Sequence, residues 1–232
     1  MDKRHCWPEG HWNWPITVTH KHGVRCGEMI WVGGQVDLTP EGVVLNQGDL
    51  ATQTVSVMSN FATVLKGLDC DLEDLVFLLC FYVNDGSVDE AEFLNMVGAC
   101  LPEGTHTAVN AVPVPYLAYE GMRVEIEGYA MRRENGDRTT RTYAVNQGTS
   151  LLPDKFCQAL RSGKMIFVSG QYPIDSVGNV LEPGDIVAQT NLEMAQTKTL
   201  LSQFGAGFGD VVKNNRWYSG GAGIDDFEPA AL

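Results

Sequence analysis

Apolar and polar positions at the start of the chain predict two strands followed by a helix. The apolar run MIWVGGQV begins at residue 29, and LTPEG at 38–42 supplies turn residues that would end a strand. VVL at 43–45 predicts a second, short extended piece. Between 49 and 67 the apolar side chains recur at helical spacing, so we expect a helix with Asp49 as its N-cap.

The following residues predict another helix and three more strands. LVFLLCFYV at 75–83 is short, continuous and apolar. This pattern predicts a strand that is buried on both faces, by the helix on one side and by another subunit on the other. A second helix is expected within 88–100, with strands near 107–114 and 122–131.

The last of these strands alternates regularly between apolar and polar residues. RVEIEGYAM places Val124 and Ile126 on one face and Glu125 and Glu127 on the other. The predicted order of elements is therefore β-β-α-β-α-β-β. This order indicates an α+β domain with its helices packed on a sheet.

A second part of the chain repeats the first. GEMIWVGGQ at 27–35 is matched by GKMIFVSGQ at 163–171. The same spacing along the chain relates further identical residues: Gly42, Asp49, Gln53, Thr54 and Met58 are matched by Gly178, Asp185, Gln189, Thr190 and Met194. The chain therefore holds two tandem copies of one domain.

The repeat divides the chain into four parts. We expect an aromatic N-terminal extension at 1–14, a first domain at 15–133, a linker at 134–152 and an incomplete second domain at 153–232. The second copy is expected to run like the first through NNRWYSG at 214–220, without its last two strands. An open sheet edge is costly, so either the chain is a fragment of a longer product, which we favour, or another element completes the sheet.

Composition and charge exclude several classes of protein. The formal net charge of −13 disfavours nucleic acid as a partner, and the arginines between 132 and 141 fit a solvated connector better than a phosphate site. No apolar run is long enough to cross a membrane, so we expect a soluble, cytoplasmic protein. The six cysteines show no paired CxxC spacing and are expected to be reduced thiols rather than disulfides or zinc ligands.

Three segments of the chain carry a resemblance to a known family. They are FCQALRSGKMIFVSGQYPID at 156–175, GNVLEPGDIVAQT at 178–190, and VEIEGYAMRR at 124–133. Together they resemble the Rid family, also called RidA or YjgF, of imine and enamine deaminases. The resemblance implies a chorismate-mutase-like α+β fold, assembled as a trimer or pseudo-trimer with ligand clefts between subunits. It also implies that water adds to an imine and ammonia leaves, without a metal or organic cofactor.

The resemblance also assigns site residues. The Arg that holds the substrate carboxylate in the family aligns with His106, and histidine cannot form a guanidinium fork. The carboxylate that orients or activates water aligns with Glu125. Residues expected to bind substrate are His106, Asn95, His20, Gly34, Phe156 and Gly170. Ordinary imines derived from amino acids are therefore doubtful substrates for the first copy.

Two functions follow, and they belong to different classes. The first is a Rid-type hydrolytic deaminase of a reactive imine or enamine, with water positioned by Glu125. The alternative is a non-catalytic module that binds a small ligand, such as a carboxylate, or that serves assembly after losing its chemistry. Either function fits a homo-oligomer, and cleavage of RNA is disfavoured by the acidic charge.

The N-terminal extension adds aromatic residues of its own. Trp7, Trp12 and Trp14 lie close together and are expected to cover a sheet edge or a subunit contact, or else to close a ligand cleft. His20 and His22 share a face in a strand, but scattered histidines of this kind more often lie on the surface than bind a metal.

Overall fold

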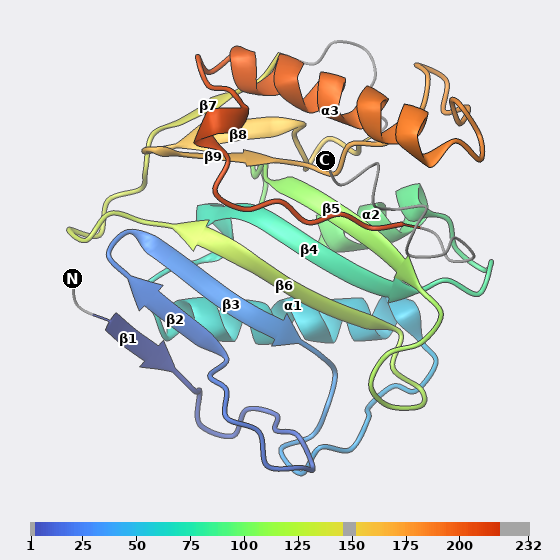
Figure 1. Cartoon of the computed structure of the whole chain (residues 1–232). Coiled ribbons are helices and arrows are strands. Elements are labelled where there is room, and N and C mark those ends of the chain that lie inside the picture. The colour runs from blue at the N-terminus through green and yellow to red at the C-terminus, as the bar shows by residue number, and fades with distance from the viewer. Residues whose placement is uncertain (1–2, 146–151, 219–232) are drawn as a thin grey trace.

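Six strands of the first half of the chain form one mixed sheet (Figure 1). The computed structural model describes residues 3–145 and 152–218. The sheet order is β1, β2, β3, β6, β4, β5, in which β4 and β5 are parallel and the other neighbours antiparallel. The strands are β1 (Lys3–Cys6), β2 (Gly23–Cys26), β3 (Met29–Gln35), β4 (Leu75–Val83), β5 (Ala108–Val114) and β6 (Val124–Met131).

Two helices cover one face of this sheet. Helix α1 (Leu50–Lys66) begins after Asp49, whose carboxylate accepts a hydrogen bond from the backbone N–H of Thr52, as the sequence predicts. Helix α2 (Glu90–Ala99) lies beside it, and the 3-10 turn η1 (Leu72–Asp74) leads into β4. Apolar side chains of α1, such as Phe61, pack on inward residues of β4 and β6 to form the main core.

The second copy covers part of the opposite face, which we call the outer face. Strand β7 (Arg141–Tyr143), which lies within the expected linker, joins strands β8 (Ala159–Ser162) and β9 (Met165–Val168) of the second copy in a small antiparallel sheet beneath α3 (Ile186–Ser202), as Figure 1 shows. The 3-10 turn η2 (Phe208–Asp210) follows α3. Leu160 and Phe167 of the small sheet pack with Val76 of β4 and Ala108 of β5. The second copy of the same chain thus covers part of the outer face of β4. The apolar pattern of β4 predicts another subunit in this place instead.

Matching hydrogen bonds confirm that the domain occurs twice. In the first copy Gln53 Nε2 donates to the Leu45 carbonyl oxygen at 3.1 Å. In the second copy Gln189 Nε2 donates to the Leu181 carbonyl oxygen, also at 3.1 Å. Donor and acceptor are both related by the spacing of the sequence repeat, so the two copies share local structure as well as sequence.

Two expected strands do not form. The piece at 43–45 makes only an isolated bridge between Val44 and Leu38, while strand β2 supplies the neighbour of β3 instead. Residues 211–218 align with β4 but form no strand. Lys213, Asn214, Asn215 and Arg216 stand where β4 has four apolar residues, so this segment cannot be buried on both faces.

The arginines of the expected connector pair with acidic residues of η1 and the turn before it. Arg132 Nη1 lies 3.0 Å from the buried carboxylate of Asp74, and Arg138 Nη2 lies 2.9 Å from Asp71. They hold the segment after β6 against the start of β4. Residues 133–138 are exposed, as expected of a solvated connector, and these pairs anchor two of its arginines. No helix within the described residues is long and apolar enough to cross a bilayer.

Candidate functional site

The Glu125 carboxylate on β6 lies directly against Gly34 of β3. The β3–β6 register shifts between Val32 and Gln35, and within this irregularity Gly34 lies beside Glu125. A Cβ added to Gly34 would overlap Glu125 Oε1, whereas one added to Gly33 would meet nothing nearer than 3.7 Å. Gly34 is therefore required for this position of the carboxylate, and Gly33 is not.

Burial changes the acidity of Glu125. The side chain is half-buried on the outer face, and this loss of solvation raises the pKa of its carboxyl above the ordinary value. The neighbouring Glu127, two residues along the same face, raises the pKa further. A carboxyl with a raised pKa exchanges protons closer to neutral pH than an ordinary glutamate does.

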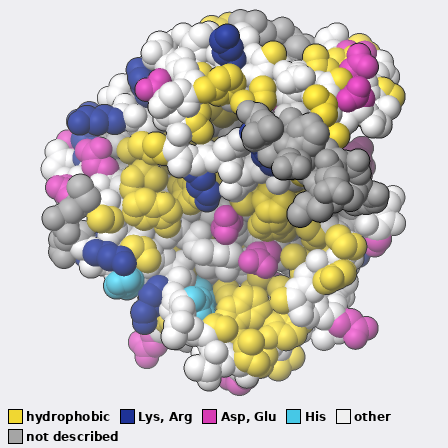
Figure 2. All heavy atoms as spheres, viewed as in Figure 1, with side chains coloured by type: hydrophobic (Ala, Val, Ile, Leu, Met, Phe, Trp, Pro, Cys, Tyr) yellow, Lys and Arg dark blue, Asp and Glu magenta, His cyan; other side chains and the backbone are white. Residues whose placement is uncertain are grey.

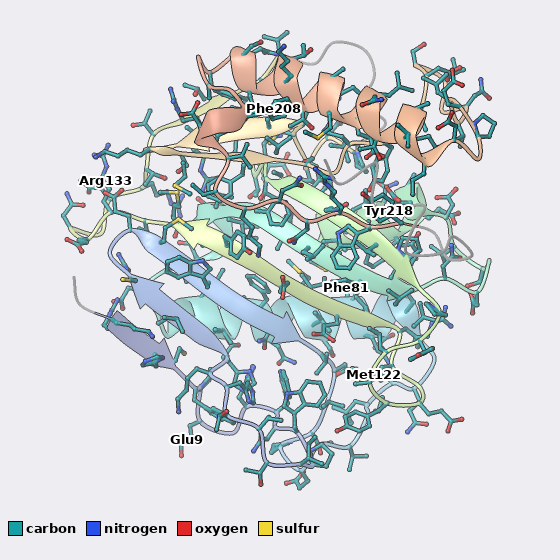
Figure 3. The ribbon with its side chains drawn as sticks, viewed as in Figure 1. Glu9, Phe81, Met122, Arg133, Phe208 and Tyr218 are labelled. Atoms are coloured by element: carbon teal, nitrogen blue, oxygen red, sulfur yellow. The ribbon has the colours of Figure 1, made fainter. Side chains whose placement is uncertain are left out.

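Aromatic side chains lie beside Glu125 on the outer face. Phe81 of β4 is its cross-strand neighbour, and the Trp217 ring packs on Phe81 at 5.4 Å between ring centroids. Figure 3 labels Phe81 on the sheet and Tyr218 in the segment that crosses above it. In Figure 2 acidic side chains lie near the centre of this face, among hydrophobic ones. The carboxylate is therefore flanked by apolar surface.

The N-terminal extension forms a cluster of tryptophan and histidine rings next to the glycines. Trp12 is only 2% exposed, and its ring packs 4.6 Å from that of His22. His20 packs on Trp7 and Trp12, and its two ring nitrogens are buried without a hydrogen-bond partner among the described residues. His20 thus lies within an aromatic cluster formed with Trp7, Trp12 and His22.

Gln35 connects this cluster to the glycine segment. Its Oε1 accepts hydrogen bonds from His11 Nε2 at 2.8 Å and from Trp12 Nε1 at 3.1 Å. Its Nε2 donates to the Gly33 carbonyl at 2.9 Å. The cluster therefore fixes the backbone that carries Gly34. Over residues 3–145 and 152–218 no three histidine, cysteine or acidic side chains are grouped as metal ligands would be.

Acid should destabilise this cluster. Burial, aided by His11 and His20, lowers the pKa of His22 to about 4, so the folded protein favours its neutral form. The resulting stability is present above the unfolded pKa of about 6.5 and is lost as pH falls toward 4. We expect Tm to fall more between pH 7 and 4.5 in the wild type than in His22→Gln, by differential scanning calorimetry. Equal slopes would contradict this assignment.

The other residues expected to bind substrate lie elsewhere. His106 is exposed before β5, with its ring 5.9 Å from that of Tyr143, and Asn95 is exposed on α2. Phe156 is 6% exposed and belongs to the core of the first copy. The structure does not bring these three together with Glu125. Gly170 instead lines a cleft between the two copies.

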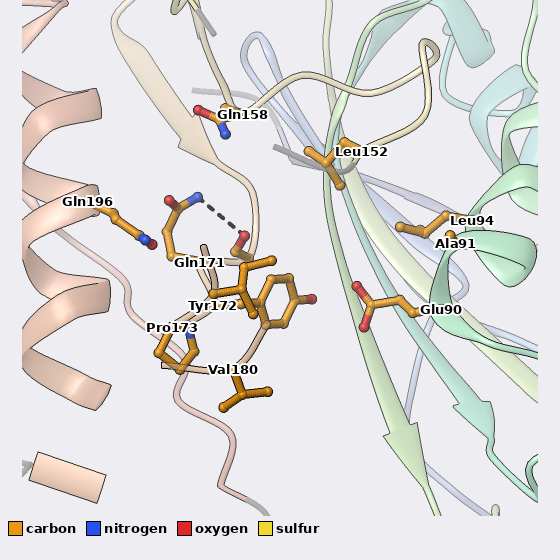
Figure 4. Close-up of a pocket in the computed structure, with 12 residues that line it drawn as sticks. Glu90, Ala91, Leu94, Leu152, Gln158, Gln171, Tyr172, Pro173, Val180 and Gln196 are labelled. Atoms are coloured by element: carbon orange, nitrogen blue, oxygen red, sulfur yellow. Dashed lines mark hydrogen bonds between the residues drawn. The ribbon is translucent and has the colours of Figure 1, made fainter. Parts of the chain in front are cut away.

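That cleft has a volume of about 340 Å³, within the range of small-molecule sites (Figure 4). Its walls come from the start of α2 and from the segment that follows β9. The Tyr172 hydroxyl points toward the Glu90 carboxylate across it, as Figure 4 shows. Burial raises the pKa of Glu90, against a smaller lowering by the Tyr172 hydroxyl. Burial also raises the pKa of Tyr172.

The glycines of the two copies meet different partners. Gly34 lies against the Glu125 carboxylate, whereas a Cβ added to Gly170 would overlap Asn110 Oδ1 of β5. The edge of β5 bonds directly to the second copy, because Gly170 N donates to the Val109 carbonyl at 3.0 Å. The Asn110 amide thus faces Gly170, whereas the Glu125 carboxylate faces the equivalent Gly34.

The family model described as Endoribonuclease L-PSP matches residues 15–132 and again 151–228. The chain belongs to this family. The two matches confirm the resemblance to Rid proteins and the tandem arrangement of two copies of their α+β fold.

Individual relatives in the family are similar over shorter stretches. A RutC family protein of Pyrococcus abyssi is 41% identical over 58 residues, which are 25% of this chain and 46% of the relative. Protein DfrA of Myxococcus xanthus is 40% identical over 52 residues, 22% of this chain and 40% of the relative. The chain thus spans less than half the length of these curated relatives.

Solved structures of the family are also similar to the chain. RidA from the Antarctic bacterium Psychrobacter sp. PAMC 21119 is 23% identical with a TM-score of 0.47, covering 55% of this chain and 98% of RidA. The yeast protein YEO7 is 21% identical with a TM-score of 0.49, and the match covers 57% of this chain and 100% of YEO7.

Sequence reasoning missed Glu90 and Tyr172, which line the cleft of this Rid protein, and Asn110, whose side chain contacts Tyr172. Glu90, Asn110 and Tyr172 lie on α2, on β5 and after β9, far apart in the sequence. The only signal in the sequence for these residues was that Tyr172 directly follows the SGQ segment at 169–171. Glu90 has the pattern of an ordinary acidic residue in the first turn of a helix.

Proposed function

We propose that this Rid-family protein hydrolyses a reactive imine or enamine, with water positioned by Glu125. The observation that carries the proposal is the contact between Gly34 and the Glu125 carboxylate, which would be lost if any larger residue replaced the glycine. The resemblance in sequence also aligns Glu125 with the family carboxylate that orients or activates water. No metal or cofactor enters the proposed reaction, in which protein carboxylate and water suffice.

The proposed reaction balances with a single carboxylate. Glu125 accepts a proton from water as the water oxygen bonds to the imine carbon and the C=N bond becomes a single bond. Glu125 returns this proton to the nitrogen, which gives a carbinolamine. Glu125 then accepts the hydroxyl proton and passes it to the nitrogen, so that the C–O bond becomes a carbonyl as the C–N bond breaks and ammonia leaves. The raised pKa supports both steps, since the group must accept and return a proton near neutral pH.

The substrate is proposed to be small and reactive, and it need not carry a carboxylate. His106 replaces the expected Arg, lies exposed and packs against Tyr143. Histidine cannot form the bidentate guanidinium contact that an Arg would give a carboxylate, so strong carboxylate binding is not expected at His106. The His20 cluster stays a proposed contact at the edge of this site, whereas Asn95 lies on α2, which covers the opposite face of the sheet.

Assembly into a homo-oligomer is proposed as well. Trp31 of β3 is 39% exposed on the outer face, on the side that the second copy does not cover. An exposed tryptophan within a sheet face favours a partner surface. In a trimer or pseudo-trimer, a neighbouring subunit would form a further wall of the Glu125 site. RNA remains disfavoured as a partner because the net charge is −13.

A direct assay of ammonia tests the function. Imines generated in situ from a panel of amino acids and simple amines are supplied to the full chain, and ammonia release is followed by a coupled reaction. We expect a rate above the uncatalysed reaction for at least one imine. A panel without any accelerated substrate would instead favour the alternative, a ligand-binding module without deaminase chemistry.

The pH dependence of this rate should identify the carboxylate. The rate should rise with pH as Glu125 ionises, because only the carboxylate accepts a proton from water. Glu127→Gln removes a charge that raises the pKa of Glu125, so the midpoint should move to lower pH while the plateau rate stays close to that of the wild type. A midpoint that stays in place in Glu127→Gln would argue against Glu125 as the titrating group.

A further inference from the structure

The cleft between the two copies contains one negative charge and no positive charge among the described residues that line it. Glu90 supplies the carboxylate, and Asp89 lies next to it at the N-cap of α2. Three glutamines, at 158, 171 and 196, line the same space with neutral amides. A bound anion would therefore meet repulsion from Glu90 without a compensating cation on the described walls.

The polar groups around Tyr172 also offer more acceptors than donors. Its hydroxyl oxygen lies 3.3 Å from Asn110 Oδ1 and 3.3 Å from the Ala111 carbonyl oxygen, and it faces Glu90 as well. A phenol has a single hydrogen to donate, so it can satisfy only one of these three acceptors at a time. The cleft is short of hydrogen-bond donors at this end.

The remaining wall is apolar. Ala91 and Leu94 of α2 face Pro173, Ile174 and Val180 of the second copy across the cleft. A ligand that fits must therefore combine a donor-rich cationic end with an apolar body. A primary ammonium group carries three N–H donors and one positive charge, and it matches both the excess of acceptors and the charge of Glu90.

We propose that the cleft between the two copies binds a small organic ammonium ion, with its nitrogen held by Glu90 and Tyr172, which both line the cleft. Gly170 faces the neutral Asn110 amide and not a second carboxylate. Glu90 is therefore the one charged group among the described residues that line the cleft. The site differs from the Glu125 site in position and chemistry, and ligand binding there does not depend on hydrolysis.

Binding of matched probes to the full chain tests the proposal. Isothermal titration calorimetry with benzylammonium, benzyl alcohol and benzoate compares a cation, a neutral molecule and an anion of the same shape. We expect benzylammonium to bind best and benzoate not to bind measurably. Benzoate binding as tightly as benzylammonium, or no benzylammonium binding at all, would overturn the proposal.

Variants locate the binding. Glu90→Gln keeps the size of the side chain and removes its charge, so benzylammonium should bind at least about tenfold more weakly. Glu92→Gln, on the same helix turn but outside the cleft, is the matched control and should bind like the wild type. Equal affinity in wild type and Glu90→Gln would show that the cation binds elsewhere and would overturn the proposal.

The same titrations in Glu125→Gln separate this proposal from the proposed function. Benzylammonium should bind this variant like the wild type, because Glu125 does not line the cleft. If the protein binds benzylammonium but hydrolyses no imine, the cleft proposal stands and the proposed deaminase function is refuted. If the protein hydrolyses an imine but does not bind benzylammonium, the deaminase function stands and the cleft proposal is refuted. The melting temperature of each variant, measured in parallel, verifies that it is folded.

Discussion

Replacing Glu125 with glutamine should lower kcat/KM for imine hydrolysis by about 10²–10⁴-fold, the usual contribution of one positioned acid or base. Glutamine preserves the size of the side chain but cannot accept a proton from water. The loss should appear mainly in kcat, because the substrate still has its binding surface. Steady-state ammonia release, measured on the pH plateau of the wild type, gives both constants.

Two matched pairs make this prediction specific. Glu127→Gln lies on the same strand and face and should retain the plateau rate. Gly34→Ala should lose activity to a similar extent as Glu125→Gln, since the new Cβ would displace the carboxylate, whereas Gly33→Ala has space and should stay active. Equal activity in Gly34→Ala and Gly33→Ala would show that the position of Glu125 does not matter for the reaction.

Replacing Trp12 with alanine should lower the free energy of unfolding by about 3–5 kcal/mol, the cost of removing a large buried aromatic side chain. The indole is 2% exposed, contacts Val36, Leu38 and Met122, and donates a hydrogen bond to Gln35. Its loss leaves a cavity and removes one of the two hydrogen bonds that Gln35 Oε1 accepts. Urea denaturation followed by circular dichroism measures the change.

Trp7 is the control for this prediction. It belongs to the same N-terminal cluster, but it is 39% exposed and rests on His20 and His22 from outside. Trp7→Ala should therefore cost clearly less than Trp12→Ala. A similar loss in both variants would mean that the extension acts as a loose apolar cover and not through the buried contacts of Trp12.

The two copies now have different proposed roles. The first copy places a carboxylate against its glycine, and we propose hydrolysis there. The second copy places an amide from its neighbour against the equivalent glycine, beside an acidic cleft, and we propose cation binding there. Duplication of one domain would then have separated a reaction from a binding function in one chain.

The sequence by itself determined the elements that depend on local patterns. Helix α1 with its Asp49 cap, strand β4 and the alternation of Glu125 and Glu127 on β6 followed from apolar spacing and from capping chemistry. The repeat was also visible directly, because identical residues at a fixed spacing require no structure to detect. The fold class agrees with these features, and the family was indicated separately by the resemblance of the segments 124–133, 156–175 and 178–190.

Only the tertiary structure decided which residues meet. Glu90 and Tyr172 face each other although they lie in different copies of the domain, and no local pattern encodes that pairing. The packing of the second copy on the outer face of β4, and the burial of Phe156 in the first core, depend equally on how the copies dock. Local periodicity fixes which side of an element is apolar, but the partner that covers it is chosen by long-range packing, which a single sequence does not reveal.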